Sequence, residues 1–227
     1  NFLEIPFYKH DTKTGRSRVV SGTNYLTMKK EKREKLKPSN DRILDEVDFS
    51  SCEPSFYFLA MGCKIKNDLY ESIKQELDID VDRKKLKLAI ISILYGAGYD
   101  VVKKTTKLSN SEYEKIKNHM QIDAFKSKYL NENSDMYYNY YGRPILNCNE
   151  KSKVNYWVQS SAVDFAYLCF YEYAKTIKTI QIHAVIHDAM LFSIEKLHEN
   201  QVKNVTALSE DISNFKIPVK IRKISDN

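Results

Sequence analysis

Two aspartates in this sequence each lie near the end of an apolar, strand-like segment. Residues 180–194 are mostly β-branched and aromatic around His187-Asp188, which predicts a β-hairpin with Asp188 at its tip. Residues 42–51 predict a strand that ends in a polar turn, and they include Asp48. Two carboxylates brought together from strand ends can hold two Mg²⁺ ions, which prefer oxygen ligands. Spacing alone favours two unrelated aspartates, because Asp is a common turn residue.

Four side chains recur at every fourth position in a predicted helix over residues 82–95: Arg83, Lys87, Ile91 and Tyr95. At about 3.6 residues per turn they share one face, which is cationic at its start and aromatic at its end. Cations can hold a triphosphate, and a ring can lie near a base or sugar. The same pattern also fits a helix with snorkelling basic residues and a buried tyrosine.

Asn155 and Gln159 are also four residues apart, in a long predicted helix over residues 150–177. Their amides could reach the acceptors that every base pair presents in the minor groove. The other interpretation is an exposed polar stripe.

Strands near both ends with helices between them predict an α+β fold. Besides the segments above, we expect a helix from Pro54 to about Met61, further helices and a last strand. The remaining predicted helices cover residues 66–78, 110–130 and 197–211; residues 137–143 are expected to form a loop and residues 216–224 a strand.

Composition sets loose bounds on function. The chain has 227 residues and a formal net charge of +6, which is compatible with a polyanionic partner but does not demand one. Residues 29–37 are strongly basic, a pattern more typical of a solvated face than of a nucleic-acid contact. The four cysteines have no CxxC spacing, and no apolar run is long enough to span a membrane. We expect an intracellular protein with no membrane partner, in a bacterial or phage-infected cytoplasm or, alternatively, an organelle.

Five segments, in this order, resemble the polymerase domain of family A DNA polymerases. Residues 48–53 (Asp-Phe-Ser-Ser-Cys-Glu) resemble motif A, and residues 83–96 resemble motif B. Residues 186–188 (Ile-His-Asp) resemble motif C. The other two segments are the Thr-Gly-Arg element at residues 14–16 and the helix that precedes motif C, at residues 155–164.

The resemblance implies a role for each matching residue. Asp48 and Asp188 would be catalytic and would bind two Mg²⁺ ions, with Mn²⁺ as an alternative. Incoming dNTP would be bound by five residues: Arg83, Lys87, Ile91, Tyr95 and Glu53. Glu53 would also act with Tyr95 as a gate against the ribose 2′-hydroxyl. Primer–template DNA would be contacted by five more: Arg16, Arg143, Asn155, Gln159 and His187.

The resemblance also implies a domain order. Residues 1–64 would be the first part of the palm, residues 65–140 the helical fingers and residues 141–227 the second part of the palm, with an antiparallel sheet. Family members place a helical thumb before the Thr-Gly-Arg element, and the residues before Thr14 are too few to build one. We therefore expect the thumb in a missing N-terminal region or on a separate subunit.

Three departures from the family pattern bear on activity. Ala189 replaces a usual Glu, Ile91 replaces a usual aromatic residue, and Pro54-Ser55 replaces a usual Leu-Arg. The sequence predicts a template-directed DNA polymerase module that adds dNTPs to a primer 3′ end. The alternative is a polymerase-derived DNA-binding or scaffold subunit with little or no synthesis. A single-subunit RNA polymerase relative is a third interpretation, against which Glu53 argues.

Overall fold

The computed structural model describes residues 6–39, 41–65, 68–130, 136–146, 149–202 and 215–226. The chain forms two compact units. Unit 1 comprises residues 1–52 and 162–227, and unit 2 comprises residues 53–161. The boundaries fall within helices α2 (Cys52–Ala60) and α8 (Glu150–Lys175). Among the described residues, no helix has the length and apolar character needed to cross a membrane.

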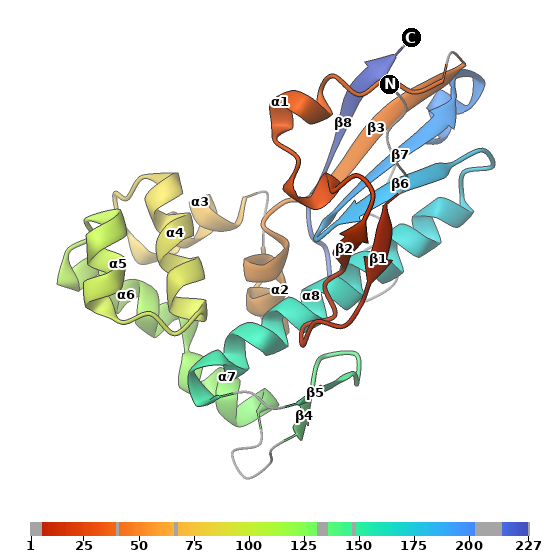
Figure 1. Cartoon of the computed structure of the whole chain (residues 1–227). Coiled ribbons are helices and arrows are strands. Elements are labelled where there is room, and N and C mark those ends of the chain that lie inside the picture. Colours follow the sequence, from red (N-terminus) through yellow and green to blue (C-terminus); the bar gives the residue numbers. More distant parts are fainter. Residues whose placement is uncertain are drawn as a thin grey trace. The chain divides into compact units, whose positions relative to one another are not determined.

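Unit 1 is built on a four-stranded antiparallel sheet (Figure 1). Its strands, in the order β6-β7-β3-β8, are Gln181–Ile186, Ala189–Glu195, Arg42–Phe49 and Val219–Asp226. The predicted hairpin is confirmed, because β6 pairs with β7 directly through the His187-Asp188 turn. The predicted strands over residues 42–51 and 216–224 are confirmed as β3 and β8, with ends shifted by a few residues.

Successive side chains of strand β3 point to opposite faces of the sheet, and both faces are packed. Phe49 packs against Phe165 and Phe170 of α8, with ring centroids 5.0 and 5.4 Å apart. Leu44 belongs to a second buried cluster with Ile186 and Leu191. Asp48 has the same parity as Leu44, so it lies on the face opposite Phe49.

The face that carries Asp48 also buries an ion-pair network. Glu46 is 7% exposed and accepts hydrogen bonds from Arg33 and Arg222, each at 2.9 Å. Arg33 ends the short helix α1 (Lys30–Arg33), within the basic run over residues 29–37. Part of that run therefore neutralises a buried carboxylate, a role that the sequence pattern does not indicate.

The N-terminal part of unit 1 contributes a small hairpin, β1 (Phe7–Lys9) and β2 (Arg18–Ser21), and a 3₁₀ turn, η1 (Tyr25–Thr27). Unit 2 is mainly helical. Its remaining elements are α3 (Leu69–Leu77), α4 (Arg83–Leu94), α5 (Tyr99–Thr106), α6 (Asn110–Met120), α7 (Ile122–Tyr129), β4 (Met136–Tyr138) and β5 (Pro144–Leu146).

Local capping explains where several helices of unit 2 begin. Asp68 and Asp82 accept backbone N–H bonds at the starts of α3 and α4, and Ser109 with Glu112 forms a capping box at α6. The rings of Tyr57 and Phe125 pack in a tilted arrangement, with centroids 4.7 Å apart, in the buried centre of this unit.

The structure corrects several sequence-based boundaries. The helix predicted over residues 110–130 is two helices, because Gln121 adopts a left-handed conformation (φ 51°) between α6 and α7. Residues 99–106 form a helix that was not predicted, and β4 covers part of the expected loop at 137–143. In the helix predicted over 197–211, residues up to Gln201 are a 3₁₀ segment, η2 (Lys196–Gln201), and residues 203–214 lie outside the described part of the chain.

Candidate active site

Asp48 and Asp188 are brought together at neighbouring strand ends of unit 1. In the β3–β7 pairing Asp48 lies opposite Ala189, and the next residue, Phe49, donates its backbone N–H to the carbonyl oxygen of Asp188 at 3.0 Å. His187 takes a left-handed backbone conformation (φ 57°), which turns the chain between β6 and β7. Both aspartates are half-buried. The sequence-predicted pair thus shares one edge of the sheet.

The donor set around these aspartates fits Mg²⁺ that is completed by substrate. Within the described part of the chain, no three His, Cys, Asp or Glu side chains form a metal-binding group. Mg²⁺ commonly uses one or two protein carboxylates together with waters and substrate phosphates, so a closed protein cage is not required. Asp48 and Asp188 are the residues that would hold such ions.

Arg16, His187 and Cys52 share the electrostatic surroundings of the two aspartates. Burial lowers the pKa of His187, and the nearby charge of Arg16 lowers it further. Burial also raises the pKa of the Cys52 thiol well above its usual value, and the carboxylates of Asp188 and Asp48 add to that increase. Cys52 is therefore a protonated, inert neighbour of the carboxylates.

Lys220 lies beside Asp48 and was not among the residues predicted from sequence. In the β3–β8 pairing, Lys220 is the register partner of Asp48, and its side chain is exposed. Directly opposed residues in an antiparallel pair point to the same face. Asp48 thus has Ala189 on one flank and a lysine on the other. Only the strand register, which joins segments far apart in sequence, could have revealed this neighbour.

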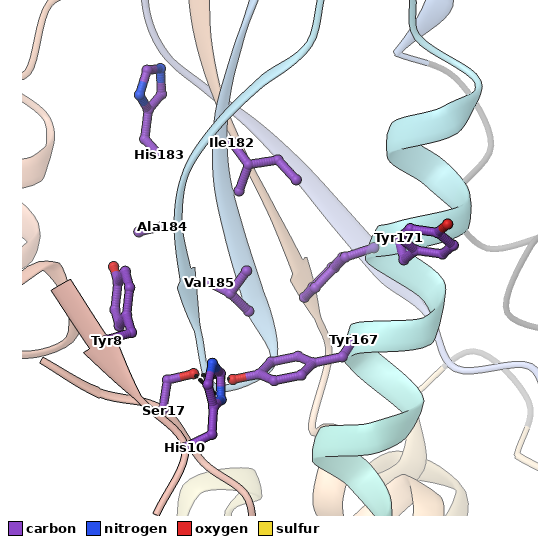
Figure 2. A pocket seen from close by; sticks show the side chains of 10 residues that line it. Tyr8, His10, Ser17, Tyr167, Tyr171, Ile182, His183, Ala184 and Val185 are labelled. Carbon is purple, nitrogen blue, oxygen red and sulfur yellow. Dashed lines mark hydrogen bonds between the residues drawn. The ribbon is translucent and has the colours of Figure 1, made fainter. Parts of the chain in front are cut away.

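The segment that carries Arg16 is anchored within unit 1. The Thr12 hydroxyl donates to the Arg16 carbonyl at 2.8 Å, and the hydroxyl of Ser17 shares a hydrogen bond with Tyr167 of α8. Ser17 also lies 3.2 Å from His10 Nδ1. His10, Ser17 and Tyr167 line a pocket between the β1–β2 hairpin, α8 and β6 (Figure 2). The pocket has a volume of about 370 Å³.

The predicted nucleotide-binding face of α4 is present in unit 2, but its first residue is already bound. Arg83 donates from Nε and Nη2 to one oxygen of Asp68, at 3.1 and 2.6 Å, and lies 5.0 Å from the ring centroid of Tyr70. The hydrogen bond to Asp68 raises the pKa of Arg83. Lys87 is exposed and Ile91 is half-buried.

Four predicted site residues form one hydrogen-bonded chain within unit 2. The Tyr95 hydroxyl donates to Glu53 Oε2 at 3.2 Å and accepts from Gln159 Nε2 at 3.0 Å. Gln159 Nε2 also donates to Asn155 Oδ1 at 2.7 Å. Tyr95 lies one residue beyond α4 and is 45% exposed, so the chain of bonds reaches the surface of the unit.

Arg143 lies in the turn between β4 and β5, also in unit 2. Its Nη2 donates to the carbonyl oxygen of Ser160 on α8 at 3.1 Å.

The predicted site residues fall into two groups. Unit 1 holds Asp48, Asp188, Arg16 and His187; unit 2 holds Glu53, Arg83, Lys87, Ile91, Tyr95, Arg143, Asn155 and Gln159.

Comparison with known proteins identifies the fold. No family model matches the sequence, and no curated protein matches it. The structure resembles that of the POL domain of Pol1 from M. smegmatis in complex with DNA primer-template and dNTP, with a TM-score of 0.69 and 13% sequence identity. The match covers 96% of this chain and 47% of that chain, so this chain spans about half of its length. The similarity confirms the polymerase-type α+β fold that the resemblance to family A DNA polymerases predicts.

Proposed function

We propose that this chain is the palm-and-fingers part of a template-directed DNA polymerase. The observation that carries the proposal is the adjacency of Asp48 and Asp188 at neighbouring strand ends, in a fold similar to a polymerase domain. The reaction is attack of a primer 3′-hydroxyl on the α-phosphate of a dNTP, with pyrophosphate leaving. The fingers, residues 65–140, would lie within unit 2, which also holds residues 53–64 and 141–161 of the palm; unit 1 would hold the rest of the palm.

Each unit would contribute a different part of the chemistry. In unit 1, Asp48 and Asp188 would hold Mg²⁺, which when bound supplies activation of the attacking hydroxyl and neutralises charge on the leaving oxygen. Arg16 would contact the primer–template in the minor groove, and His187 would lie near the primer end. Catalysis of this kind is mainly positioning and charge neutralisation, so the side chains that orient the substrates matter as much as the carboxylates.

Unit 2 would bind the nucleotide and the duplex. Lys87 and Arg83 would hold the triphosphate; Arg83 would first exchange its bond to Asp68 for a phosphate. Glu53, held by Tyr95, would lie against the sugar and reject a 2′-hydroxyl. Asn155 would donate to minor-groove acceptors, which occupy similar positions in every base pair and so suit a sequence-independent enzyme. Gln159 is 8% exposed and donates to both Tyr95 and Asn155, so it would first exchange one of these bonds for the DNA.

Primer extension tests the proposal directly. The chain is incubated with a primer–template, Mg²⁺ and dNTPs and compared with Asp188→Asn and Asp48→Asn. Each variant should lose at least about a thousandfold in extension rate, because stabilisation by bound metal is worth several kcal/mol. Asp123→Asn is the matched control, since the Asp123 side chain is fully exposed on α7. DNA affinity should be unchanged in all three.

The second candidate is a DNA-binding scaffold with little synthesis. Ala189 beside Asp48 and the engagement of Arg83 by Asp68 favour it. Primer–template binding by the chain without extension, at any ratio of Mg²⁺ or Mn²⁺ to dNTP, would reject the polymerase proposal in favour of this one. Extension with rNTPs in place of dNTPs would instead support the RNA polymerase relative.

A further inference from the structure

The turn between β4 and β5 is organised by a buried asparagine. Asn139 is only 4% exposed. Its Oδ1 accepts the backbone N–H groups of Tyr141 and Arg143, at 3.0 and 2.8 Å, and its Nδ2 donates to Ser160 Oγ at 2.9 Å. One side chain therefore caps the turn internally and joins it to helix α8.

Backbone bonds reinforce this arrangement. Asn139 donates its N–H to the Arg143 carbonyl at 2.9 Å, and Gly142 donates its N–H back to the Asn139 carbonyl at 3.0 Å. The N–H of Tyr140 donates to Ser161 Oγ at 3.0 Å. Both serines are fully buried, so the turn is tied to two consecutive residues of α8 through a part of unit 2 that excludes water.

The same helix position also orients the Arg143 side chain. Ser160 receives the Asn139 amide on its hydroxyl and Arg143 Nη2 on its carbonyl. A guanidinium is a rigid planar fork, so a bond from one nitrogen restricts the orientation of the whole group. Ser160 directly follows Gln159, which is itself bonded to Asn155. Arg143 is thus fixed to the same segment of α8 that carries the two amides proposed to read the minor groove.

We propose that Asn139 is a positioning residue that holds Arg143 for contact with a phosphate of the primer–template duplex. The inference rests on the proposed function, because it takes double-stranded DNA as the ligand. Asn139 makes no contact with DNA in this scheme and acts only through the turn. An arginine that neutralises a phosphate releases counterions, so its removal changes the salt dependence of binding as well as its strength.

A purely structural role for Asn139 predicts a different result. Removing a buried, satisfied amide leaves two turn N–H groups and the Ser160 hydroxyl with fewer partners, which destabilises the turn in either case. Only the positioning role predicts that one arginine–phosphate pair disappears from the binding equilibrium. The slope of log K against log salt reports how many phosphates the protein neutralises, and it decreases by about one when one such pair is removed.

The test measures binding of a fluorescent primer–template to the full chain by anisotropy over a salt series. Arg143→Ala should reduce the salt slope by about one. Asn139→Ala should reduce it equally and weaken binding about tenfold at low salt, the scale of one charge-assisted hydrogen bond. The double variant should resemble Arg143→Ala, because both changes remove the same interaction with DNA.

Two further variants keep the test decisive. Thr106→Val is the matched control, because Thr106 is also fully buried in unit 2 and its hydroxyl donates to the Val102 carbonyl at 2.7 Å. It should leave affinity and slope unchanged. Asn139→Ser keeps a side-chain oxygen for the turn but lacks the amide donor, so it should lie between wild type and Asn139→Ala.

An unchanged slope in Asn139→Ala, or a further decrease in slope when it is added to Arg143→Ala, would overturn the inference. Fold integrity of each variant is checked by its unfolding transition. If Asn139→Ala does not fold, the salt slope of Asn139→Ser is the deciding measurement. A slope for Asn139→Ser equal to that of the wild type would overturn the positioning role. Binding needs no synthesis, so failure of primer extension by the wild-type chain would reject the proposed function separately.

Discussion

The Tyr95 hydroxyl donates a hydrogen bond to Glu53 Oε2 at 3.2 Å, joining the residue after α4 to the first turn of α2. The same hydroxyl accepts from Gln159. The residue proposed to exclude a ribose hydroxyl is therefore oriented by a side chain that is itself bonded to a proposed DNA-binding amide. Within unit 2, the residues proposed to select the sugar and to bind the duplex belong to one hydrogen-bonded network.

Sugar selectivity should fall when the hydrogen bonds of the Tyr95 hydroxyl, which link Glu53 to Gln159, are removed. Tyr95→Phe removes both bonds of the hydroxyl, and incorporation of rNTP relative to dNTP should rise about tenfold, because Glu53 loses the partner that orients it. Glu53→Ala should produce a larger rise. The measurement is single-nucleotide extension with matched rNTP and dNTP.

Tyr129→Phe is the control for this prediction. It removes a hydroxyl of the same kind, which donates to the Ala60 carbonyl at 2.7 Å in the same unit. Its selectivity should match that of the wild type. Equal selectivity in wild type and Tyr95→Phe would show that the hydroxyl does not hold the gate.

Nucleotide affinity should rise when Asp68 loses its charge. In the proposed function Asp68 would compete with a triphosphate for Arg83, since its Oδ2 accepts a hydrogen bond from Arg83 Nη2 at 2.6 Å. Burial alone would raise the pKa of Asp68, but hydrogen bonds from Arg83 and the α3 backbone lower it overall, so the carboxylate is charged at neutral pH. Asp68→Asn should lower KM for dNTP severalfold, consistent with a partly exposed ion pair worth under about 1 kcal/mol.

Asparagine is chosen because it is as good an N-cap as aspartate, so the start of α3 is retained. Asp82→Asn makes the same change at the N-cap of α4, where the carboxylate accepts backbone N–H groups of Lys84 and Lys85. It should leave KM near the wild-type value. A KM for Asp68→Asn that equals or exceeds wild type would argue that Arg83 does not bind the triphosphate.

Acid should destabilise unit 1 through His183. Burial lowers the pKa of this imidazole and the charge of Arg42 lowers it further; His183 Nε2 lies 2.9 Å from Ser193 Oγ, which also accepts from Arg42 at 2.9 Å. Because the folded state disfavours the protonated ring, this contribution to stability is present above pH 6.5 and is lost as the pH falls. His187 titrates in the same direction.

Urea unfolding at pH 7.5 and 5.5 checks this prediction. His183→Gln should lose less stability between the two pH values than the wild type does, while His187→Gln accounts for the second histidine. An NMR titration gives the His183 pKa independently, and it should lie below that of an unstructured histidine. A His183 pKa at or above 6.5 in the folded chain would contradict the assignment.

Elements with strong local signals were predictable from sequence. The hairpin around Asp188 has β-branched flanks and a polar turn, and α8 keeps an apolar pattern over its 26 residues. The break between α6 and α7 was not predictable, because Gln121 takes its left-handed conformation without a Gly or Pro to mark it. The extra helix α5 follows two glycines in a polar stretch whose burial depends on neighbouring helices.

For the candidate site too, the residues were predictable from sequence but their partners were not. Residue types in order indicated Asp48, Asp188 and the face of α4. The partners of those residues depend on non-local pairing. Lys220 reaches Asp48 only through strand register. The sequence predicts only a loop at Asn139, and its proposed positioning role depends on a bond to Ser160. Propensity patterns contain no information about such contacts, since they are set by the packing of segments far apart in the chain.

The turn after Tyr95 should tolerate no side chain at Gly96. This glycine has φ +79°, and a Cβ built on it would lie 3.0 Å from the backbone carbonyl oxygen of Lys151, which cannot easily move. Gly96→Ala should therefore lower the free energy of unfolding by about 2–3 kcal/mol, combining left-handed strain with the steric contact. It should also disturb Tyr95, the preceding residue, and so raise KM for dNTP.

Gly98→Ala, two residues further on, is the control. It distinguishes the effect of positive φ and steric contact at Gly96 from the general loss of glycine flexibility. Gly98 has an extended backbone (φ −79°, ψ 175°), and its added Cβ would meet nothing within 4 Å. It is the N-cap of α5, so alanine there should cost no more than about 1 kcal/mol, without a change in KM. Chemical denaturation of both variants measures the difference. Equal losses would mean that neither the positive φ nor the approach of Lys151 constrains the turn, and the hydrogen-bonded position of Tyr95 would then need another explanation.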